Sequence, residues 1–130
     1  MKRMEFMLLL GALGLGLMCG CSSTPKVVEG SGAKFVPLDK GVERSVTCPS
    51  IQERFTDDGR LELIANLRNR LNRRIEVQVS CVFKDDKGFP TNDEAPFKTL
   101  ILDENAQEGV RFVSMNNQAR TYTIRVRQAR

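Results

Sequence analysis

Apolar residues occupy every second position of residues 75–83, and this alternation is the strongest structural signal in the chain. The positions between them are polar except for Val82, so one face of the segment is expected to be buried and the other solvated. Residues 61–67 alternate in the same way, and we predict that residues 61–89 form a β-hairpin. The side chains predicted to point into the core, here and in later strands, are Leu61, Leu63, Leu67, Val77, Val79, Cys81, Phe83, Phe112, Ile124 and Val126.

Similar but shorter stretches predict further strands at residues 42–48, 97–102, 109–115 and 121–127. Pro49 is expected to end the first of these, because proline cannot donate a hydrogen bond to a β-ladder. The predicted connections are a turn or single helical turn at residues 51–59, a tight turn at 85–88 and a polar loop at 91–96. Short strands joined by polar turns predict an all-β protein folded as an antiparallel sandwich.

The N-terminal segment has the features of a secretory signal. Lys2 and Arg3 precede an apolar run at residues 6–18, which is shorter than the ~20 apolar residues needed to cross a bilayer. The run leads into Gly20 and Cys21, which resemble a bacterial lipobox, where a small residue precedes the cysteine that is lipidated. This resemblance implies that residues 1–20 are a signal peptide and that Cys21 carries the lipid.

Lipidation at Cys21 implies anchoring to the cell envelope, since two or more acyl chains hold a protein stably on a membrane. Ser22 follows Cys21, whereas Asp at this position resembles an inner-membrane retention signal of Gram-negative lipoproteins. The expected location is therefore the periplasmic face of the outer membrane. Two alternatives are lipidation of Cys19, which follows the larger Met18, and an ordinary cleaved signal with incidental cysteines.

Residues 21–38 are rich in Ser, Thr, Pro, Lys and Gly, a composition that predicts a flexible tether behind the lipidated cysteine. Residues 39–130 then form the β-sandwich domain, at a length common for a single domain. The membrane, reached through the lipid anchor, is one expected partner, and another envelope protein is the second.

The charge balance is mild, with 20 Lys and Arg against 16 Asp and Glu, and it gives no reason to expect a nucleic-acid partner. Four arginines cluster near the predicted hairpin turn, and two more alternate outward in the last strand. One interpretation is a binding patch for a phosphate, an acidic polymer or a lipid headgroup. The other is a solvated turn whose charges discourage edge pairing. The six candidates are Arg68, Arg70, Arg73, Arg74, Arg125 and Arg127.

The residue types present argue against an enzyme. There is no His, so a relay of the Ser-His-Asp or Cys-His kind cannot form. Neighbouring carboxylates, such as Asp85 and Asp86, lie at predicted turns. Glycosidase-type chemistry instead needs two carboxylates that face each other across a cleft. We therefore expect no catalytic residues, no metal site and no cofactor.

Cys48 and Cys81 are the only cysteines outside the signal peptide and the lipobox, and each falls in the inward register of its predicted strand. Secretion delivers the chain to an oxidising compartment, where structural disulfides persist. We predict a Cys48–Cys81 disulfide. The alternative is two small buried apolar residues, since free cysteine is often buried.

Residues 60–127 contain, in order, a strand ending in Asn69, the motif Phe83-x-Asp85-x-x-Gly88, an aromatic residue at Phe97, and a final strand with Arg125 and Arg127. This order resembles the YcfL family of small envelope lipoproteins. It implies an Ig-like β-sandwich without known enzymatic activity. The expected function is a lipid-anchored interaction or structural module, and the alternative is a binder of a cell-wall polymer or small anionic ligand through outward arginines.

Replacing Cys21 by serine removes the thiol that the lipid would modify. We expect the Cys21→Ser protein to lose labelling by a palmitate analogue and to leave the membrane fraction. Metabolic labelling with cell fractionation measures both effects, and Cys19→Ser is the matched control. Continued labelling of Cys21→Ser would assign the lipid to Cys19 instead.

Overall fold

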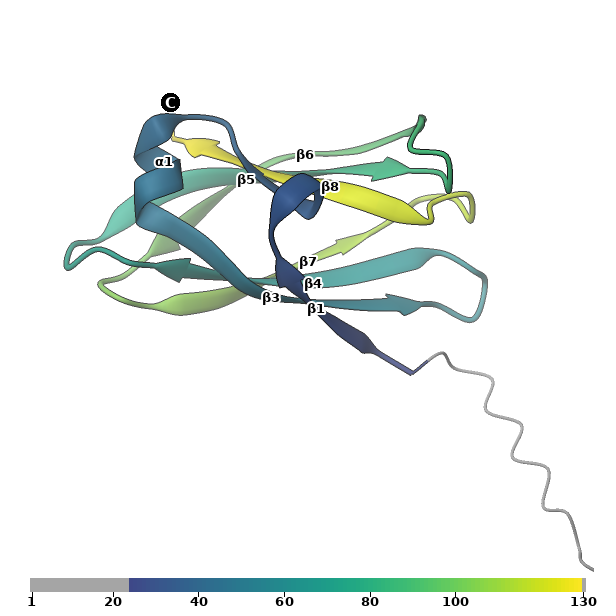
Figure 1. Cartoon of the computed structure of the whole chain (residues 1–130), viewed down its shortest axis with the longest axis horizontal. Helices are drawn as coiled ribbons and strands as arrows, with labels where there is room; N and C mark the ends of the chain where they lie inside the picture. Colours follow the sequence, from purple (N-terminus) through teal and green to yellow (C-terminus); the bar gives the residue numbers. More distant parts are fainter. Residues whose placement is uncertain (1–23, 130) are drawn as a thin grey trace, which may run out of the picture.

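Two four-stranded β-sheets stack face to face in residues 24–129, the part of the chain that this computed structural model describes (Figure 1). The predicted all-β sandwich is therefore confirmed. Sheet A has the order β1 (Lys26–Gly30), β3 (Val46–Phe55), β4 (Leu61–Asn69) and β7 (Gln107–Val113). Sheet B has the order β2 (Phe35–Pro37), β8 (Thr121–Gln128), β5 (Ile75–Lys84) and β6 (Pro90–Leu102). A short 3-10 helix η1 (Gly32–Lys34) and one α-helix α1 (Lys40–Ser45) complete the described elements.

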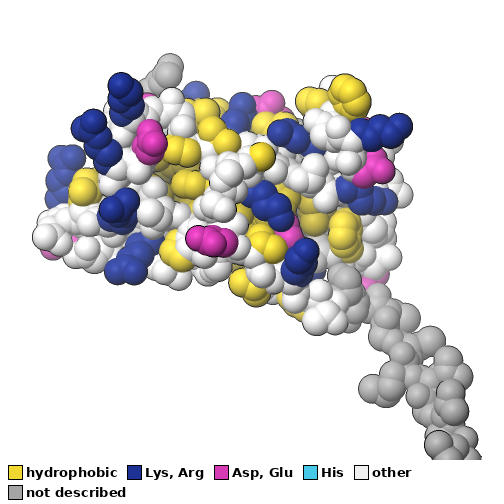
Figure 2. Space-filling model, viewed as in Figure 1, with side chains coloured by type: hydrophobic (Ala, Val, Ile, Leu, Met, Phe, Trp, Pro, Cys, Tyr) yellow, Lys and Arg dark blue, Asp and Glu magenta, His cyan; other side chains and the backbone are white. Residues whose placement is uncertain are grey.

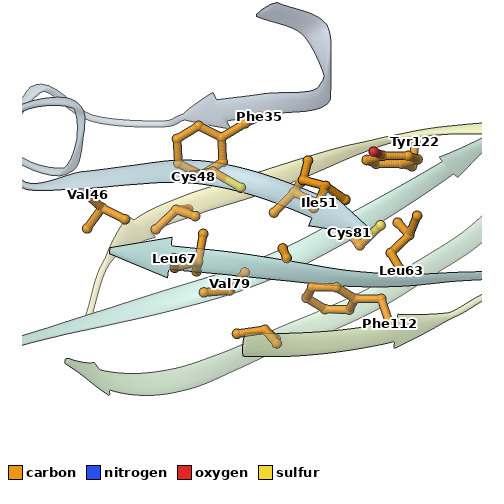
Figure 3. Packing of buried hydrophobic residues seen from close by; sticks show 14 of the residues in the cluster. Phe35, Val46, Cys48, Ile51, Leu63, Leu67, Val79, Cys81, Phe112 and Tyr122 are labelled. Atoms are coloured by element: carbon orange, nitrogen blue, oxygen red, sulfur yellow. The ribbon is translucent and has the colours of Figure 1, made fainter. Parts of the chain in front are cut away.

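The core lies between the two sheets and is built mainly from alternating side chains of β3, β4, β5, β7 and β8 (Figure 3). All ten side chains predicted to point inward are buried, which confirms the choice of face on every strand concerned. Burial of such side chains is the main favourable contribution to folding. The core also includes side chains that lie outside the ten, notably Phe35, Val42, Ile51, Leu102 and Tyr122.

The prediction of a hairpin at residues 61–89 is wrong in its pairing, although both of its strands exist. β4 pairs with β3 and β7 in sheet A, whereas β5 pairs with β6 and β8 in sheet B. Residues 70–74 therefore carry the chain from one sheet to the other. Alternation specifies which face of a strand is buried, and it leaves open whether the next strand lies beside it or across the core.

The prediction of a flexible tether at residues 21–38 is wrong for most of that range. β1 pairs antiparallel with β3, and β2 pairs parallel with β8, the one parallel pair among the described strands. Both are edge strands held by backbone hydrogen bonds, which need little apolar alternation. Gly30 is required where β1 approaches β3, because a Cβ there would lie 2.4 Å from Cys48 Sγ. Residues 1–23, with the signal peptide and Cys21, lie outside the described residues.

The strand predicted at residues 42–48 is in fact the helix α1 followed by the start of β3. Asp39 caps the helix, since its Oδ1 accepts a hydrogen bond from Val42 N at 2.8 Å. Val42 and Val46 are both buried, and their spacing of four residues fits a helix face as well as a strand face. No helix within residues 24–129 is long and apolar enough to cross a membrane.

Two strands continue through positions where the sequence predicted an end or a loop. β3 runs past Pro49, where the register with β4 shifts between Thr47 and Ser50, so the turn predicted at residues 51–59 begins only after Phe55. β6 likewise includes the predicted loop at residues 91–96. It is an edge strand, and edges and bulges are the places where a sheet tolerates proline.

A charge placed in the core should unfold the domain. We expect Val79→Asp to lower the free energy of unfolding by about 3–5 kcal/mol, the usual cost of an uncompensated buried charge. Denaturant titration measures the change. Gln78→Asp is the matched control, because Gln78 faces outward on the same strand and accepts a hydrogen bond from Arg127. A Val79→Asp protein as stable as the parent would contradict the observed core.

Candidate functional site: the basic end of the sandwich

Basic side chains gather at the end of the sandwich formed by α1 and the connection between β4 and β5 (Figure 2). All of them are exposed. We call this group the basic end, and it consists of Lys40, Arg44, Arg70, Arg73 and Arg74.

The helix holds its basic residues in place because it is fastened at both ends. Asp39 Oδ1 caps its first turn, and Asp39 Oδ2 accepts a hydrogen bond from Gln128 N at 2.8 Å, which ties the helix to the end of β8. At the other end, Arg70 N donates to the Ser45 carbonyl oxygen at 2.8 Å. This bond brings the β4–β5 connection against the last turn of α1, beside Arg44.

The side chain of Asn69, which is fully buried, shapes the β4–β5 connection. Its Nδ2 donates to the carbonyl oxygens of Arg73 at 2.8 Å and Asp103 at 2.9 Å, and lies 3.2 Å from that of Leu102. Its Oδ1 accepts a hydrogen bond from Leu71 N at 2.9 Å. One amide therefore joins the β4–β5 connection to the β6–β7 connection and sets the backbone from which Arg73 projects.

Two shallow hollows flank α1 at this end. One, of about 540 Å³, is lined by Lys40, Glu43, Arg44 and Arg70. The other, of about 360 Å³, contains Arg73, Arg74 and Glu76 and is bordered by Gly41, Val42 and Ser45 from the opposite side of the helix. Arg74 Nε lies 3.6 Å from Asp103 Oδ1. Five basic side chains line the two hollows against two acidic ones, Glu43 and Glu76, so the hollows attract anions.

The structure does not bring the six predicted arginines together. Arg70, Arg73 and Arg74 lie at the basic end, whereas Arg68 is exposed on β4 in sheet A. Arg125 and Arg127 lie on β8 in sheet B, so they belong to a different surface.

Arg125 and Arg127 are occupied by contacts within their own sheet. The Arg127 guanidinium carbon lies 3.6 Å from the ring centroid of Phe97, and Arg127 Nε donates to Gln78 Oε1 at 2.8 Å. Arg125 lies 5.3 Å from the same ring centroid and pairs with Glu94. Cation–π contacts of this kind cover the outer face of the sheet, so these two residues are poor candidates for ligand binding.

Sequence analysis missed Lys40 and Arg44, because the helix that carries them was predicted as a strand. A signal for the helix is present in the chain. Asp39 is a favoured N-cap residue just before the helical segment, and Arg44 lies in its last turn, where a cation is favourable.

The predicted disulfide between Cys48 and Cys81 is absent from the structure, in which both thiols are free and buried (Figure 3). Cys48 Sγ is directed along its own strand and lies 3.6 Å from the Ser50 carbonyl oxygen, at the bulge in β3. Burial raises the pKa of Cys48 to about 11 and also raises the pKa of Cys81 above its usual range. Both thiols therefore stay protonated at neutral pH, and a protonated thiol is a weak nucleophile.

Metal ligands are not clustered in the described part of the chain. Within residues 24–129, no group of three or more His, Cys, Asp or Glu side chains is arranged to hold a metal ion.

These features define a small β-sandwich protein with one basic end. The chain belongs to the DUF1425 family: residues 36–128 match the family's sequence model, described as "Protein of unknown function (DUF1425)". The fold is similar to the crystal structure of Campylobacter jejuni cj0090, with a TM-score of 0.60 at 16% identity over 75% of this chain and 100% of that chain. It is also similar to a DUF1425 family member from Shewanella sp. pv-4, with a TM-score of 0.60 at 22% identity over 81% and 97% of the two chains. No curated protein matches the chain.

Removing the Asn69 amide should destabilise the domain, because its partners are backbone groups that lose their hydrogen bonds. Each buried polar group left unpaired costs about 1–3 kcal/mol, so we expect Asn69→Ala to lower the free energy of unfolding by at least that amount. Denaturant titration checks the value. Asn66→Ala is the matched control on the same strand, since the Asn66 side chain donates to Ser50 Oγ in a partly exposed pair. Equal effects of the two substitutions would contradict the role given to Asn69.

Proposed function

We propose that this protein is a lipid-anchored, non-catalytic interaction module of the cell envelope, whose basic end binds an acidic surface of another envelope protein. The observation that carries the proposal is the position of the basic end. It lies at the opposite end of the long axis of the sandwich from the start of β1, the first described strand (Figure 1). An anchor attached to the chain just before Lys26 would leave the basic end pointing away from the membrane.

The anchor itself is proposed from the sequence. An apolar run at residues 6–18 followed by Gly20 and Cys21 is the arrangement that a lipoprotein signal requires. Ser22 after Cys21 favours the periplasmic face of the outer membrane. Membership of the YcfL-like lipoproteins, a finer assignment than the DUF1425 family, belongs to the same proposal.

The basic end has the properties of a binding surface rather than of an internal support. Within residues 24–129, Arg74 is the one member of the group that forms an ion pair, and that pair is long and exposed. The cationic groups of Lys40, Arg44 and Arg70 instead surround a hollow. Charges of this kind mainly speed encounter with an oppositely charged partner and select its orientation. Binding should therefore weaken as salt is raised.

An anionic cell-wall polymer is the second candidate ligand. The two hollows beside α1 favour it, because each could receive a small acidic group of a repeating polymer between basic side chains. The two candidates differ in what must be present for binding: purified wall material suffices for the second and not for the first.

Charge reversal at the basic end tests the proposal. We expect the double variant Arg70→Glu, Arg73→Glu to lose a partner that the parent protein recovers by crosslinking and affinity capture from solubilised envelopes. The matched control is Arg68→Glu, which reverses a charge on the exposed face of β4 outside the basic end. The captured partner should be recovered less at high salt and should carry an acidic surface.

Co-sedimentation with purified peptidoglycan separates the two candidates. Sedimentation of the parent and loss in the double variant would favour the polymer as ligand. Equal recovery of every captured protein by the parent and the double variant, without sedimentation of either, would contradict a binding role for the basic end.

A further inference from the structure

Three connections meet at the end of the sandwich opposite the basic end: residues 56–60, 85–89 and 114–120 (Figure 1). We call this the turn end. The described chain also begins here, because β1 starts beside the last residues of β3: Lys26 pairs with Glu53. The part of the chain that precedes residue 24 therefore joins the domain at the turn end.

The most exposed large apolar side chains lie at this end. Met115 is 85% exposed, Val27 67% and Phe89 66%, and no other large apolar side chain within residues 24–129 exceeds these values. Phe89 and Met115 belong to the turns themselves, and Val27 is one residue after Lys26. A single exposed apolar side chain is ordinary in a soluble protein. Three exposed apolar side chains at one end, where the chain enters the domain, instead indicate a surface that contacts something apolar.

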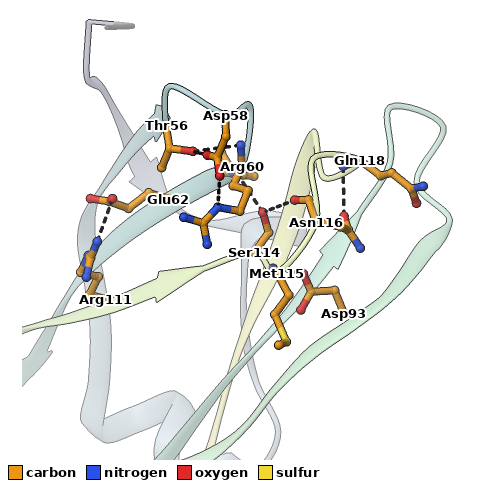
Figure 4. A network of polar contacts seen from close by, with 11 residues as sticks. Thr56, Asp58, Arg60, Glu62, Asp93, Arg111, Ser114, Met115, Asn116 and Gln118 are labelled. Carbon is orange, nitrogen blue, oxygen red and sulfur yellow. Dashed lines mark hydrogen bonds and ion pairs between the residues drawn. The ribbon is translucent and has the colours of Figure 1, made fainter.

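The turns that present Met115 and Phe89 are held by hydrogen bonds, and Figure 4 shows the polar residues around Met115. Met115 N donates to the Asp93 carboxylate, and Phe89 N donates to Asp85 Oδ1 at 2.9 Å. Next to Met115, Ser114 Oγ accepts a hydrogen bond from Leu61 N at 2.9 Å and donates to the Asn116 carbonyl oxygen at 2.8 Å. Binding through such preformed turns costs less conformational entropy than binding through mobile loops.

Charges at the turn end are mixed in sign. The acidic residues of the turns are Asp57, Asp58, Asp85 and Asp86, and the basic residues nearby are Lys26, Arg60, Lys87 and Arg120. Asp58 is already paired with Arg60 at 2.9 Å. A surface with this balance neither repels nor requires an anionic membrane, so its apolar tips suit a bilayer of zwitterionic phospholipid.

The length of chain before the domain selects the occupant of this surface. Cys21 precedes Lys26 by five residues, and five residues span at most roughly 18 Å when fully extended. Because β1 already begins at Lys26, an anchor at Cys21 would hold the turn end against the lipid headgroups. We infer that the turn end docks on the membrane surface, with Met115, Phe89 and Val27 entering the interface. This inference rests on the proposed lipid anchor.

The chain has no tryptophan, so single tryptophans report depth without background. The experiment uses the full lipidated protein in phosphatidylcholine and phosphatidylethanolamine vesicles with brominated acyl chains, which quench indole on contact. We expect the indole introduced by Phe89→Trp to lose most of its fluorescence relative to unbrominated vesicles. Ile101→Trp is the matched control, since Ile101 is also exposed, at 44%, and lies at the other end of β6 next to the basic end.

The failure of docking differs from the failure of the anchor. The docking alone would be overturned if the two variants carry the lipid and bind the vesicles, yet neither indole is quenched or both are quenched equally. A chain that carries no lipid would overturn both proposals. Adding Met115→Asp to the Phe89→Trp protein should reduce the quenching of the indole by brominated lipid, because a carboxylate is unfavourable in the interface. Both side chains are exposed, so melting of each variant should match the parent.

Discussion

The hydrogen bonds of the buried Asn69 amide are the interaction on which the arrangement of this sandwich most depends. Asn69 ends β4, and its side chain binds backbone groups of the connections that follow β4 and β6. Both connections carry the chain from one sheet to the other, so the backbone leaves its β-ladder and loses its usual partners there. Inside a protein such groups are costly unless they are paired. One amide supplies the pairing for both crossings.

The same crossing explains why the two ends of the molecule differ in chemistry. The β4–β5 connection meets α1 at one end, and the basic residues of both segments are brought together although they are distant in sequence. At the other end lie the tight turns, with acidic side chains that cap their own backbone, as Asp85 does for Phe89. A lipid anchor just before β1 would place the turn end at the membrane and the basic end away from it. Both proposals made for the protein rest on this difference.

The arginines on the outer face of sheet B show that a charged pattern is a weak guide to binding. Arg125 and Arg127 alternate outward as expected, yet they stack on Phe97 and bond to side chains of neighbouring strands. Their long apolar stems cover the sheet, while Arg125 Nη2 donates to Ser80 Oγ and Arg127 Nε donates to Gln78 Oε1. Arg70 and Arg73 differ because they stand on a connection, where no neighbouring strand offers partners.

The sequence by itself determined the class of fold and the buried face of β4, β5, β7 and β8, because a strand buried on one side must alternate, and Val77, Val79, Cys81 and Phe83 do so. It did not determine which strands pair. Leu67 and Val77 face the core from opposite sheets, and the alternation would look the same if they shared one. Backbone hydrogen bonding adds β1 and β2 with little side-chain signal, and Val42 and Val46 fit either a helix or a strand. The tertiary structure decided these points. Strand pairing depends on contacts between residues far apart in the chain, and so does the assembly of the basic end from α1 and the β4–β5 connection.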